Sequence, residues 1–349
     1  MNSRERVFAM LEGQPVDHLP AMPITMMFAA DQVGAKYFDY ATQSGAQAEG
    51  QIRVAERFSV DHVSVISDPC VEAADLGAAI KFFPDQPPAI DEGNALLKDK
   101  AALAHLKIPD PHGGGRMTNR IQAVRLMKER AGADKPVEGW VEGPCAESAD
   151  LRGLSRLMLD FYDDPEFVRQ LMNFVVEMEL GFAKAQIEAG ADIVGIGDAA
   201  ASLLSPRFYH DLVFPRQKKM ADRIHALGAR VRLHICGDTR HILEGMGQVG
   251  ADIVDLDSLA PLDAARRKMD PQQVLLGNID PVRVLRAGTP ESVYEAIADC
   301  HRQAGPRYIA GAGCEVVRDT PDENLRALTR YARDAVAQPL LAVQNEQDS

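Results

Sequence analysis

Short runs of β-branched and other apolar residues alternate with longer helix-forming stretches along the whole of this 349-residue chain. Most neighbouring runs are separated by enough residues for a helix that crosses back over a sheet. The segment 205–228, for example, starts with Ser205 as a helix N-cap and Pro206 at the first helical position. Alternation of this kind predicts parallel strands, and eight of them predict closure into a barrel. We therefore expect an α/β fold of the (β/α)₈ TIM-barrel type, with strands at 18–27, 60–68, 136–144, 191–199, 231–238, 251–257, 274–280 and 308–316.

The length of the chain fits one such barrel with additions. Barrels of this type take roughly 250 residues, and more where loops carry insertions. The segment 69–118 does not fit one helix and contains ADLGAAIKFFPDQPPAI, which indicates an inserted hairpin or a long loop. We expect a single (β/α)₈ barrel domain over residues 1–349, with a helix at the N-terminus and this insertion around 69–118.

Charge and hydropathy argue against two classes of partner. The net charge is −13 at pH 7, and Lys and Arg do not cluster on one predicted face, whereas nucleic-acid binding needs a basic surface. The longest apolar runs are strand-sized, so we expect no membrane-spanning segment. The first residues, MNSRERVFAMLEG, form a charged amphipathic helix without the apolar stretch of a signal peptide, and we expect a cytoplasmic protein.

Polar and thiol side chains gather at the C-terminal ends of the predicted strands. In a parallel barrel these ends form one face, which is the active-site face in enzymes of this fold. Asp and Asn after a strand can instead cap the next helix, and for any one of them that alternative stays open. Taken together, the set predicts a functional site at the barrel mouth. Its members are Asp68, Asp198, His234, Cys236, Asp238, Asp257, Asn278, Asp280, Cys314 and Glu315.

His234 and Cys236 have the spacing of two metal ligands. They stand one residue apart on a predicted strand, so their side chains share a face. Cys314, at the end of the last strand, can supply a third ligand across the barrel axis. One imidazole and two thiolates favour zinc over magnesium or calcium, and three protein ligands leave the fourth position open, as in catalytic zinc sites. We therefore predict a zinc site formed by these three residues.

The other cysteines leave part of this assignment open. A buried cysteine usually acts as a small apolar residue. Cys70 and Cys145 both follow predicted strands and can in principle reach the mouth, so either is an alternative ligand. Cys300 lies in the middle of a predicted helix and is expected to be inert.

The segment GIGDAA at 195–200 matches the glycine pattern of dinucleotide-binding loops. It follows the fourth predicted strand rather than the first, and Pro206 places the next helix start several residues later. We do not expect it to bind NAD.

Several long segments carry a family pattern. They are SRERVFAMLEGQPVDHLP, SDPCVEAADLGA, HICGDTRHILEGMGQVGADIVDLD, LLGNIDPVRVLRAGTPE and GAGCEVVRDTPDENLRAL. Together they resemble the uroporphyrinogen decarboxylase superfamily over nearly the whole chain, which implies a barrel of that family's kind. More narrowly, the chain looks like the methylcobamide:coenzyme M methyltransferase branch. That branch carries an H-x-C…C zinc motif, and His234, Cys236 and Cys314 fall on its three positions.

Two departures separate the chain from the decarboxylases that it resembles. Those enzymes carry an R-Q-A-G-R-Y stretch after the first strand, which holds the carboxylates of the substrate. The corresponding region here is PITMMFAADQVG, which has no arginine, so a tetrapyrrole with eight carboxylates would lack its cationic partners. The histidine of the decarboxylase G-H-G segment is replaced by Cys314.

The resemblance implies a zinc-dependent corrinoid methyltransferase. In such an enzyme Zn²⁺ holds a small substrate, most simply a thiol, as the thiolate that exchanges a methyl group with a corrinoid. We recognise no corrinoid-binding domain in the chain, so we expect the corrinoid on a partner protein. Three alternatives stay open: a donor-side demethylase that passes methyl from a methyl ether or amine to a corrinoid protein, a lyase of the uroporphyrinogen decarboxylase type, and a non-enzymatic corrinoid- or metal-binding module.

Three aspartates are candidate catalytic residues, namely Asp198, Asp238 and Asp257. Each can orient His234, position the substrate or accept a proton. A histidine that binds a metal usually gives its second ring nitrogen to a carboxylate. Asp238 is the nearest of the three to His234 in the sequence and is our candidate for that contact.

Overall fold

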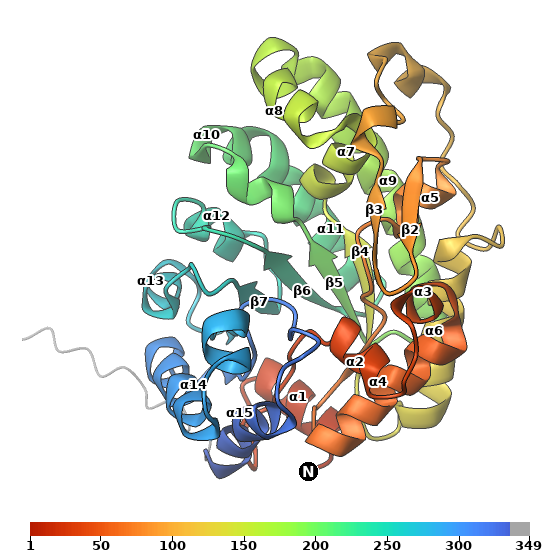
Figure 1. The fold of residues 1–349 in the computed structure, drawn as a ribbon. Coiled ribbons are helices and arrows are strands. Elements are labelled where there is room, and N and C mark those ends of the chain that lie inside the picture. Colours follow the sequence, from red (N-terminus) through yellow and green to blue (C-terminus); the bar gives the residue numbers. More distant parts are fainter. Residues whose placement is uncertain (336–349) are drawn as a thin grey trace, which may run out of the picture.

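A curled parallel β-sheet forms the centre of the molecule (Figure 1). The computed structural model describes residues 1–335. The strands lie in the order β1-β4-β5-β6-β7-β8-β9, and each pairs in parallel with the next. This order confirms the predicted α/β barrel. The strands are Val63–Ser64 (β1), Val137–Glu142 (β4), Ile193–Gly197 (β5), Arg230–Ile235 (β6), Ile253–Leu256 (β7), Val274–Leu276 (β8) and Tyr308–Ile309 (β9).

The segment 20–24 occupies the eighth position of the barrel without forming a regular strand. Met22 N donates to Ala310 O, and Ala310 N donates to Pro20 O, both at 2.9 Å. On the other side, Asp61 N donates to Ala21 O, also at 2.9 Å. The prediction of a regular strand over 18–27 is therefore wrong. Pro20 and Pro23 have no N–H to give to a ladder, and only one bridge, Ala21 to Ala310, forms there.

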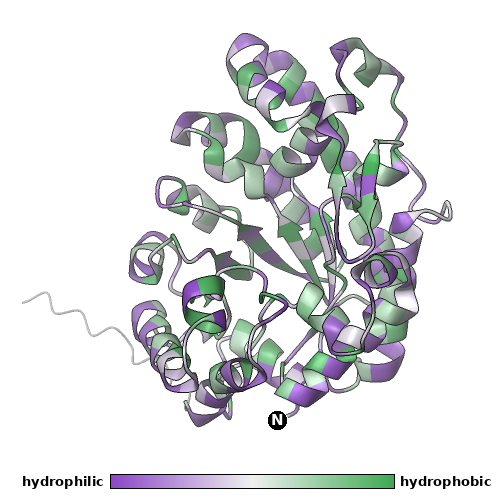
Figure 2. Ribbon diagram, viewed as in Figure 1, coloured by the Kyte–Doolittle hydropathy of each residue, from purple (hydrophilic) through white to green (hydrophobic). Residues whose placement is uncertain are grey.

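Helices cover the outside of the sheet (Figure 1), and their apolar residues face inward (Figure 2). In the last helix, for example, Leu325, Leu328 and Ala332 are buried at the spacing of one helix face. No helix within residues 1–335 combines the length and the apolar character needed to cross a membrane. The longer helices are Ser3–Leu11 (α1), Ser44–Phe58 (α4), Arg116–Ala131 (α6), Pro144–Arg152 (α7), Leu154–Asp163 (α8), Pro165–Ala189 (α9), Phe214–Ala226 (α11), Pro290–Ala304 (α14) and Asp322–Asp334 (α15).

Shorter helices lie between these elements. They are Met27–Asp31 (α2), Tyr37–Thr42 (α3), Val71–Asp75 (α5), Pro206–Phe208 (α10), Leu243–Gln248 (α12) and Leu262–Lys268 (α13). Ser205 caps α10 as predicted, since its side chain accepts from Phe208 N. The predicted helix over 205–228 is interrupted by a π-helical turn at Tyr209–Val213, just before Pro215 at the start of α11.

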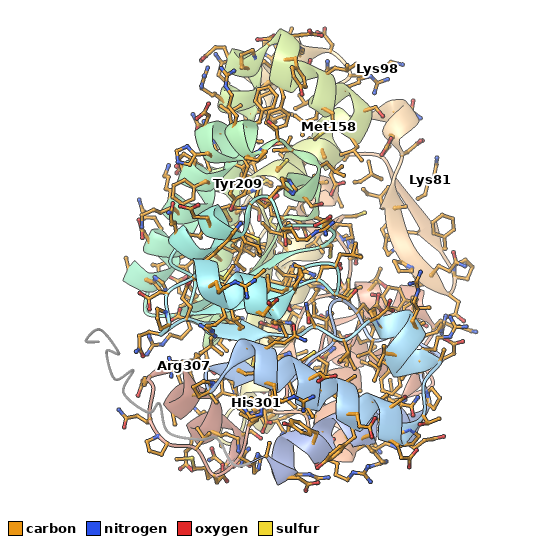
Figure 3. All side chains as sticks on the ribbon, turned by 90° about the vertical axis from the view of Figure 1, so that its left-hand side faces the viewer. Lys81, Lys98, Met158, Tyr209, His301 and Arg307 are labelled. Carbon is orange, nitrogen blue, oxygen red and sulfur yellow. The ribbon has the colours of Figure 1, made fainter. Side chains whose placement is uncertain are left out.

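Arg307 joins the N-terminal helix to the bottom of the barrel. It precedes β9 and is labelled near the lower end of the molecule in Figure 3. Its guanidinium donates to Leu11 O at 3.1 Å and to Gln272 O at 2.7 Å. Because these carbonyl groups belong to α1 and to the loop before β8, one side chain holds three parts of the chain together.

The inserted segment after β1 contains an antiparallel hairpin. Its strands are Ile80–Phe83 (β2) and Gln86–Ile90 (β3). The hairpin stands apart from the barrel sheet (Figure 1), and Lys81 on β2 is exposed at its edge (Figure 3). Its turn contacts the start of α3, where Phe38 N donates to Pro84 O at 3.4 Å.

Trp140 on β4 packs against two glycines of β5. A Cβ atom on Gly195 would lie 2.1 Å from Cε3 of the indole, and one on Gly197 would lie 2.9 Å from Cζ2. Both distances are too short for any larger residue. The glycines of GIGDAA therefore make room for a tryptophan rather than for a dinucleotide.

Replacing Gly195 by alanine should destabilise the barrel. The added methyl group must displace the buried indole, and we expect the free energy of unfolding to fall by about 1–3 kcal/mol in a urea titration. Gly181→Ala is the matched control, because Gly181 is exposed in α9 with open space around it, and alanine there should stabilise the helix by up to about 1 kcal/mol. Equal stability of the two variants would mean that Trp140 does not pack on β5 as described.

Candidate functional site

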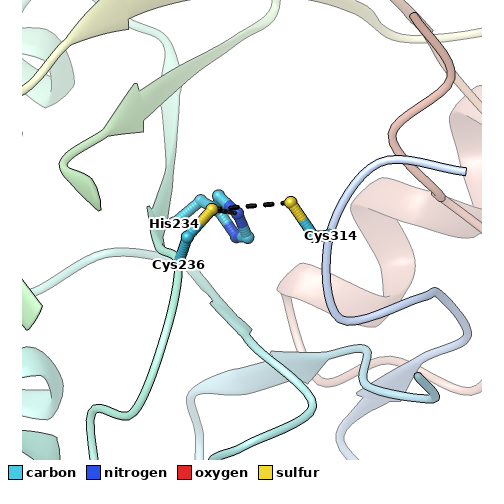
Figure 4. Close-up of side chains that lie close together, drawn as sticks. All are labelled: His234, Cys236 and Cys314. Atoms are coloured by element: carbon cyan, nitrogen blue, oxygen red, sulfur yellow. Dashed lines mark hydrogen bonds between the residues drawn. The ribbon is translucent and has the colours of Figure 1, made fainter. Parts of the chain in front are cut away.

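The structure brings His234, Cys236 and Cys314 together at the barrel mouth. His234 lies near the C-terminal end of β6, and Cys236 follows that strand. His234 Nε2 is 2.9 Å from Sγ of Cys236, which is 3.5 Å from Sγ of Cys314. The three donor atoms all lie within 4.8 Å of one another. In Figure 4 Cys314 faces the other two from the opposite side of the mouth.

The loop after β9 carries Cys314 into this group. Gly313 N donates to Ile279 O at 2.9 Å, and Ile279 pairs with Ala312. A Cβ atom on Gly313 would lie 2.3 Å from Ser258 N. The loop can therefore pass this close to the backbone after β7 only because residue 313 is glycine.

The three donors fit a zinc ion. Tetrahedral zinc with Zn–S bonds of about 2.3 Å would hold two sulfurs roughly 3.8 Å apart, close to the 3.5 Å between Cys236 and Cys314. The hydrogen bond from Cys236, aided by His234, lowers the pKa of Cys314 to about 5, so one thiol of the pair ionises readily. An imidazole with two thiolates is a donor set that zinc prefers.

The two alternative cysteines lie outside this group. Cys70 and Cys145 are fully buried, and burial raises the pKa of both thiols. Sγ of Cys70 is 3.6 Å from Pro88 O, beside the inserted hairpin. Over residues 1–335, the metal-binding group of His, Cys, Asp and Glu side chains contains neither of them.

Asp255 on β7 is the carboxylate that contacts His234. The two residues are register partners on neighbouring strands, and His234 Nδ1 lies 3.0 Å from Asp255 Oδ2. Although burial opposes a charged imidazole, Asp255 and Cys236 raise the pKa of His234 well above its usual value. The contact fixes the ring so that Nε2 points toward Cys236.

The expectation that Asp238 makes this contact is wrong. Gly237 has a positive φ of 92° and turns the chain away from the strand direction. Asp238 is therefore exposed, and it pairs with Arg240 at 2.5 Å. This surface ion pair lowers the pKa of Asp238 to about 2.

The other two predicted aspartates lie close to the ligands and hold backbone groups. Asp257 accepts from Gly237 N at 2.8 Å and so shapes the turn after Cys236. Asp198 is buried and accepts from the backbone N–H groups of Cys145 and Ala146 at 3.0 and 2.7 Å. Burial raises the pKa of Asp198 to about 6. The catalytic roles of Asp198, Asp238 and Asp257 stay predictions.

A chain of hydrogen bonds supports Asp198 from behind. Gln217 Nε2 donates to the carboxylate at 2.7 Å, and Tyr209 donates its hydroxyl proton to Gln217 Oε1, also at 2.7 Å. Tyr209 lies in the π-helical turn before α11 and is labelled in Figure 3. The π-helical turn thus positions Tyr209, which supports Asp198 through Gln217.

A cavity of about 170 Å³ opens beside the three ligands. Its wall combines apolar side chains with carboxyl groups from several strand ends. A larger hollow of about 400 Å³ shares Glu142 and Cys236 with it and continues outward. The cavity is lined by Ile24, Met26, Ile66, Asp68, Pro69, Trp140, Glu142, Gly197, Asp198, Ala199, His234, Cys236, Cys314 and Glu315.

Three residues of this site were not predicted. Trp140 and Glu142 lie on β4, in a segment whose aromatic and acidic residues also suit an ordinary strand end. Asp255 stands inside the apolar segment ADIVDLD, and this position could have marked it as a residue with a special role. A carboxylate on a buried strand needs a partner.

The chain has relatives in both branches of one protein family. The uroporphyrinogen decarboxylase (URO-D) family matches residues 2–335. A methylcobamide:CoM methyltransferase of Methanosarcina mazei is 30% identical over 339 residues, which cover 95% of this chain and 97% of that protein. A uroporphyrinogen decarboxylase of Streptomyces griseus is 31% identical over 299 residues, which cover 83% and 79%. The solved structure of a methyltransferase from Methanosarcina mazei has a TM-score of 0.87 at 23% identity, covering 96% of this chain and 98% of that one.

Removing the carboxylate behind His234 should weaken metal binding. We expect Asp255→Asn to lower zinc affinity by about tenfold to a hundredfold, because the imidazole loses the group that orients it. Competition with a chelator of known affinity measures the change. Asp238→Asn is the control and should leave zinc affinity as it is, since Asp238 contacts only Arg240 on the surface.

Asp255 also pairs with Arg232, so the asparagine variant is checked for folding by circular dichroism. Asp255→Glu provides a second test, because it keeps the charge and moves the carboxylate away from Nδ1. If Asp238→Asn weakens zinc binding and neither Asp255 variant does, the assignment of the partner of His234 is wrong.

Proposed function

This chain belongs to the uroporphyrinogen decarboxylase family, and from that premise we propose that it is a zinc-dependent methyltransferase. The proposed reaction moves a methyl group between a corrinoid and a small substrate, most simply a thiol. The observation that carries the proposal is the group of one imidazole and two thiols at the edge of a small cavity. Similarity to methylcobamide:CoM methyltransferases over 95% of the chain supports it.

The ligand group leaves room for a substrate. Three protein donors leave one position of a tetrahedral ion open, and Cys236 and Cys314 both line the cavity. Bound zinc supplies one chemical function here, which is to keep a substrate thiol deprotonated at neutral pH. Asp255 holds the His234 ring in place, while Met26 and Trp140 give the substrate an apolar wall.

The corrinoid comes from outside the chain in this proposal. The cavity beside the ligands holds about 170 Å³ and the adjoining hollow about 400 Å³, and a whole corrinoid is larger than either. A corrinoid protein would dock over the barrel mouth and present its methyl group to the cavity. The direction of transfer is the second open choice, because a donor-side demethylase would use the same ligands on a methylated oxygen or nitrogen.

The cavity wall argues against the decarboxylase alternative. Tetrapyrrole substrates with several carboxylates need cationic side chains to hold them. Within the described residues, the walls of the cavity and of the adjoining hollow contain no lysine or arginine. The absence of an arginine-rich segment after the first predicted strand agrees with this.

Zinc content should depend on the two cysteine ligands. Purified protein is expected to hold about one zinc per chain, and Cys236→Ser or Cys314→Ser should lose most of it while the fold survives, since other contacts hold the barrel together. Cys300→Ser is the matched control, because its thiol lies on α14 and outside the ligand group. Elemental analysis measures the zinc content of each variant. A full equivalent of zinc in both ligand variants would show that Cys236 and Cys314 are not the ligands.

Methyl transfer from methylcobalamin to a small thiol should follow zinc content. We expect it to stop on chelation, to return with added zinc, and to be lost in the two ligand variants but kept in Cys300→Ser. Transfer that persists without zinc contradicts the proposal. If methylated donors alter the X-ray absorption edge of the bound zinc and thiols do not, the protein is a donor-side demethylase.

Uroporphyrinogen should not be a substrate. The carboxyl groups of the cavity would face those of the tetrapyrrole, so we expect no enzymatic release of coproporphyrinogen in a chromatographic assay. Steady turnover to that product would favour the lyase alternative instead.

A further inference from the structure

We propose that the substrate of this site carries a cationic group, such as an ammonium, at the end that does not react. The inference rests on the proposed methyl transfer and names the chemical class of its small substrate. The observation behind it is that the cavity wall contains acidic side chains and no basic ones. Four carboxyl groups line the cavity, and no lysine or arginine does so in the described part of the chain; the acidic members are Asp68, Glu142, Asp198 and Glu315.

Two of these carboxyl groups already have partners. Asp68 receives two hydrogen bonds of 2.7 Å from Arg116. Asp198 accepts from two backbone N–H groups and from Gln217. Neither is free to bind a substrate.

Glu142 and Glu315 lack a cationic partner. Glu315 accepts one hydrogen bond, from Met27 N at 2.8 Å, and Glu142 lines both the cavity and the outer hollow. Within residues 1–335 neither carboxylate forms an ion pair. Burial, together with the nearby Glu72, Asp150 and Asp198, raises the pKa of Glu142 well above its usual value, and a cation in the cavity would favour the charged form of this carboxyl group.

The arginines closest to these walls are held by other carboxylates. Arg116 is bound by Asp68, as described above. Arg318 pairs with Asp31 and Asp85 at 2.5 and 3.2 Å. Arg232 is fully buried beneath the site, where Asp255 lies 2.6 Å from its guanidinium. A sulfonate or carboxylate end of a substrate would therefore meet Glu142 and Glu315 without any free cation.

Trp140 already lies beside one cation, because the guanidinium of Arg232 is 6.0 Å from the centroid of its ring. Its indole lines the cavity, and its ring centroid is 6.4 Å from that of His234. The face of an indole attracts ammonium groups, most strongly where water is excluded. Trp140 and Glu142, two residues apart on the same strand, both line the cavity, so a substrate cation would contact the part of the indole that Arg232 leaves open.

The adjoining hollow also has an acidic lining. Glu92, Glu142 and Asp150 are among its lining residues, again with no lysine or arginine. Burial raises the pKa of Glu142 and Asp150 well above the usual range, so a cation beside them would favour their charged forms, whereas an anion would meet no positive side chain in this lining.

Three two-carbon thiols test the proposal, because they differ only in the group at the far end. They are 2-aminoethanethiol, 2-mercaptoethanol and 2-mercaptoethanesulfonate. Calorimetry on the zinc-loaded protein should show that the ammonium thiol binds at least about tenfold more tightly than the sulfonate, with the neutral thiol between them. Glu142→Gln and Glu315→Gln should each reduce this ratio, while Asp263→Asn, an exposed carboxylate on α13, should keep it.

The outcomes separate the two proposals. If the sulfonate binds as tightly as the ammonium thiol or more tightly, the cationic substrate is ruled out and the thiol methyltransferase stands. A ratio unchanged in both glutamine variants also overturns the inference, because the preference would then come from elsewhere. If no thiol binds the zinc-loaded protein, the proposed thiol reaction fails and the inference falls with it.

Discussion

The guanidinium of Arg232, on β6, lies inside the barrel between carboxylates from two other strands. It is 3.2 Å from Glu138 on β4 and 2.6 Å from Asp255 on β7. Asp255 reaches onward to His234, and on the other side His62 lies 3.5 Å from Glu138. All five side chains are buried. Buried charges are tolerated only when each one is paired. This row of paired side chains therefore connects β4, β6 and β7, and it also fixes the imidazole ring of His234, which faces the candidate metal site.

Much of this arrangement was predictable from local patterns. Seven of the eight expected strands formed, because a run of β-branched residues between helix signals leaves few alternatives. His234 and Cys236 share a face for the same reason, since side chains alternate along a strand. The segment 18–27 departed from the pattern because its two prolines limit the backbone hydrogen bonds that it can form with neighbouring segments.

Asp255 could be recognised from the sequence as a buried carboxylate that needs a partner, but not as the partner of His234. Asp238 is closer in the sequence, but Gly237 turns the backbone just before it, and this turn carries Asp238 away from His234. Asp255 is 21 residues away and becomes a neighbour only through the register of β6 and β7, which pairs His234 with it. The register of two parallel strands is fixed by their packing in the folded barrel, and the residues of one strand alone do not display it. The cavity wall was hard to predict for the same reason, because its residues come from many strand ends and meet only in the folded barrel.

Trp140 is the only tryptophan in the chain, and it stands in the cavity wall. Its ring rests on two glycines on one side and lies near His234 on another. Indole emission changes in colour and intensity with the polarity and the quenching groups around it. Every photon of tryptophan fluorescence from this protein therefore originates beside the cavity, so the molecule contains its own optical reporter of what enters there, without any added label.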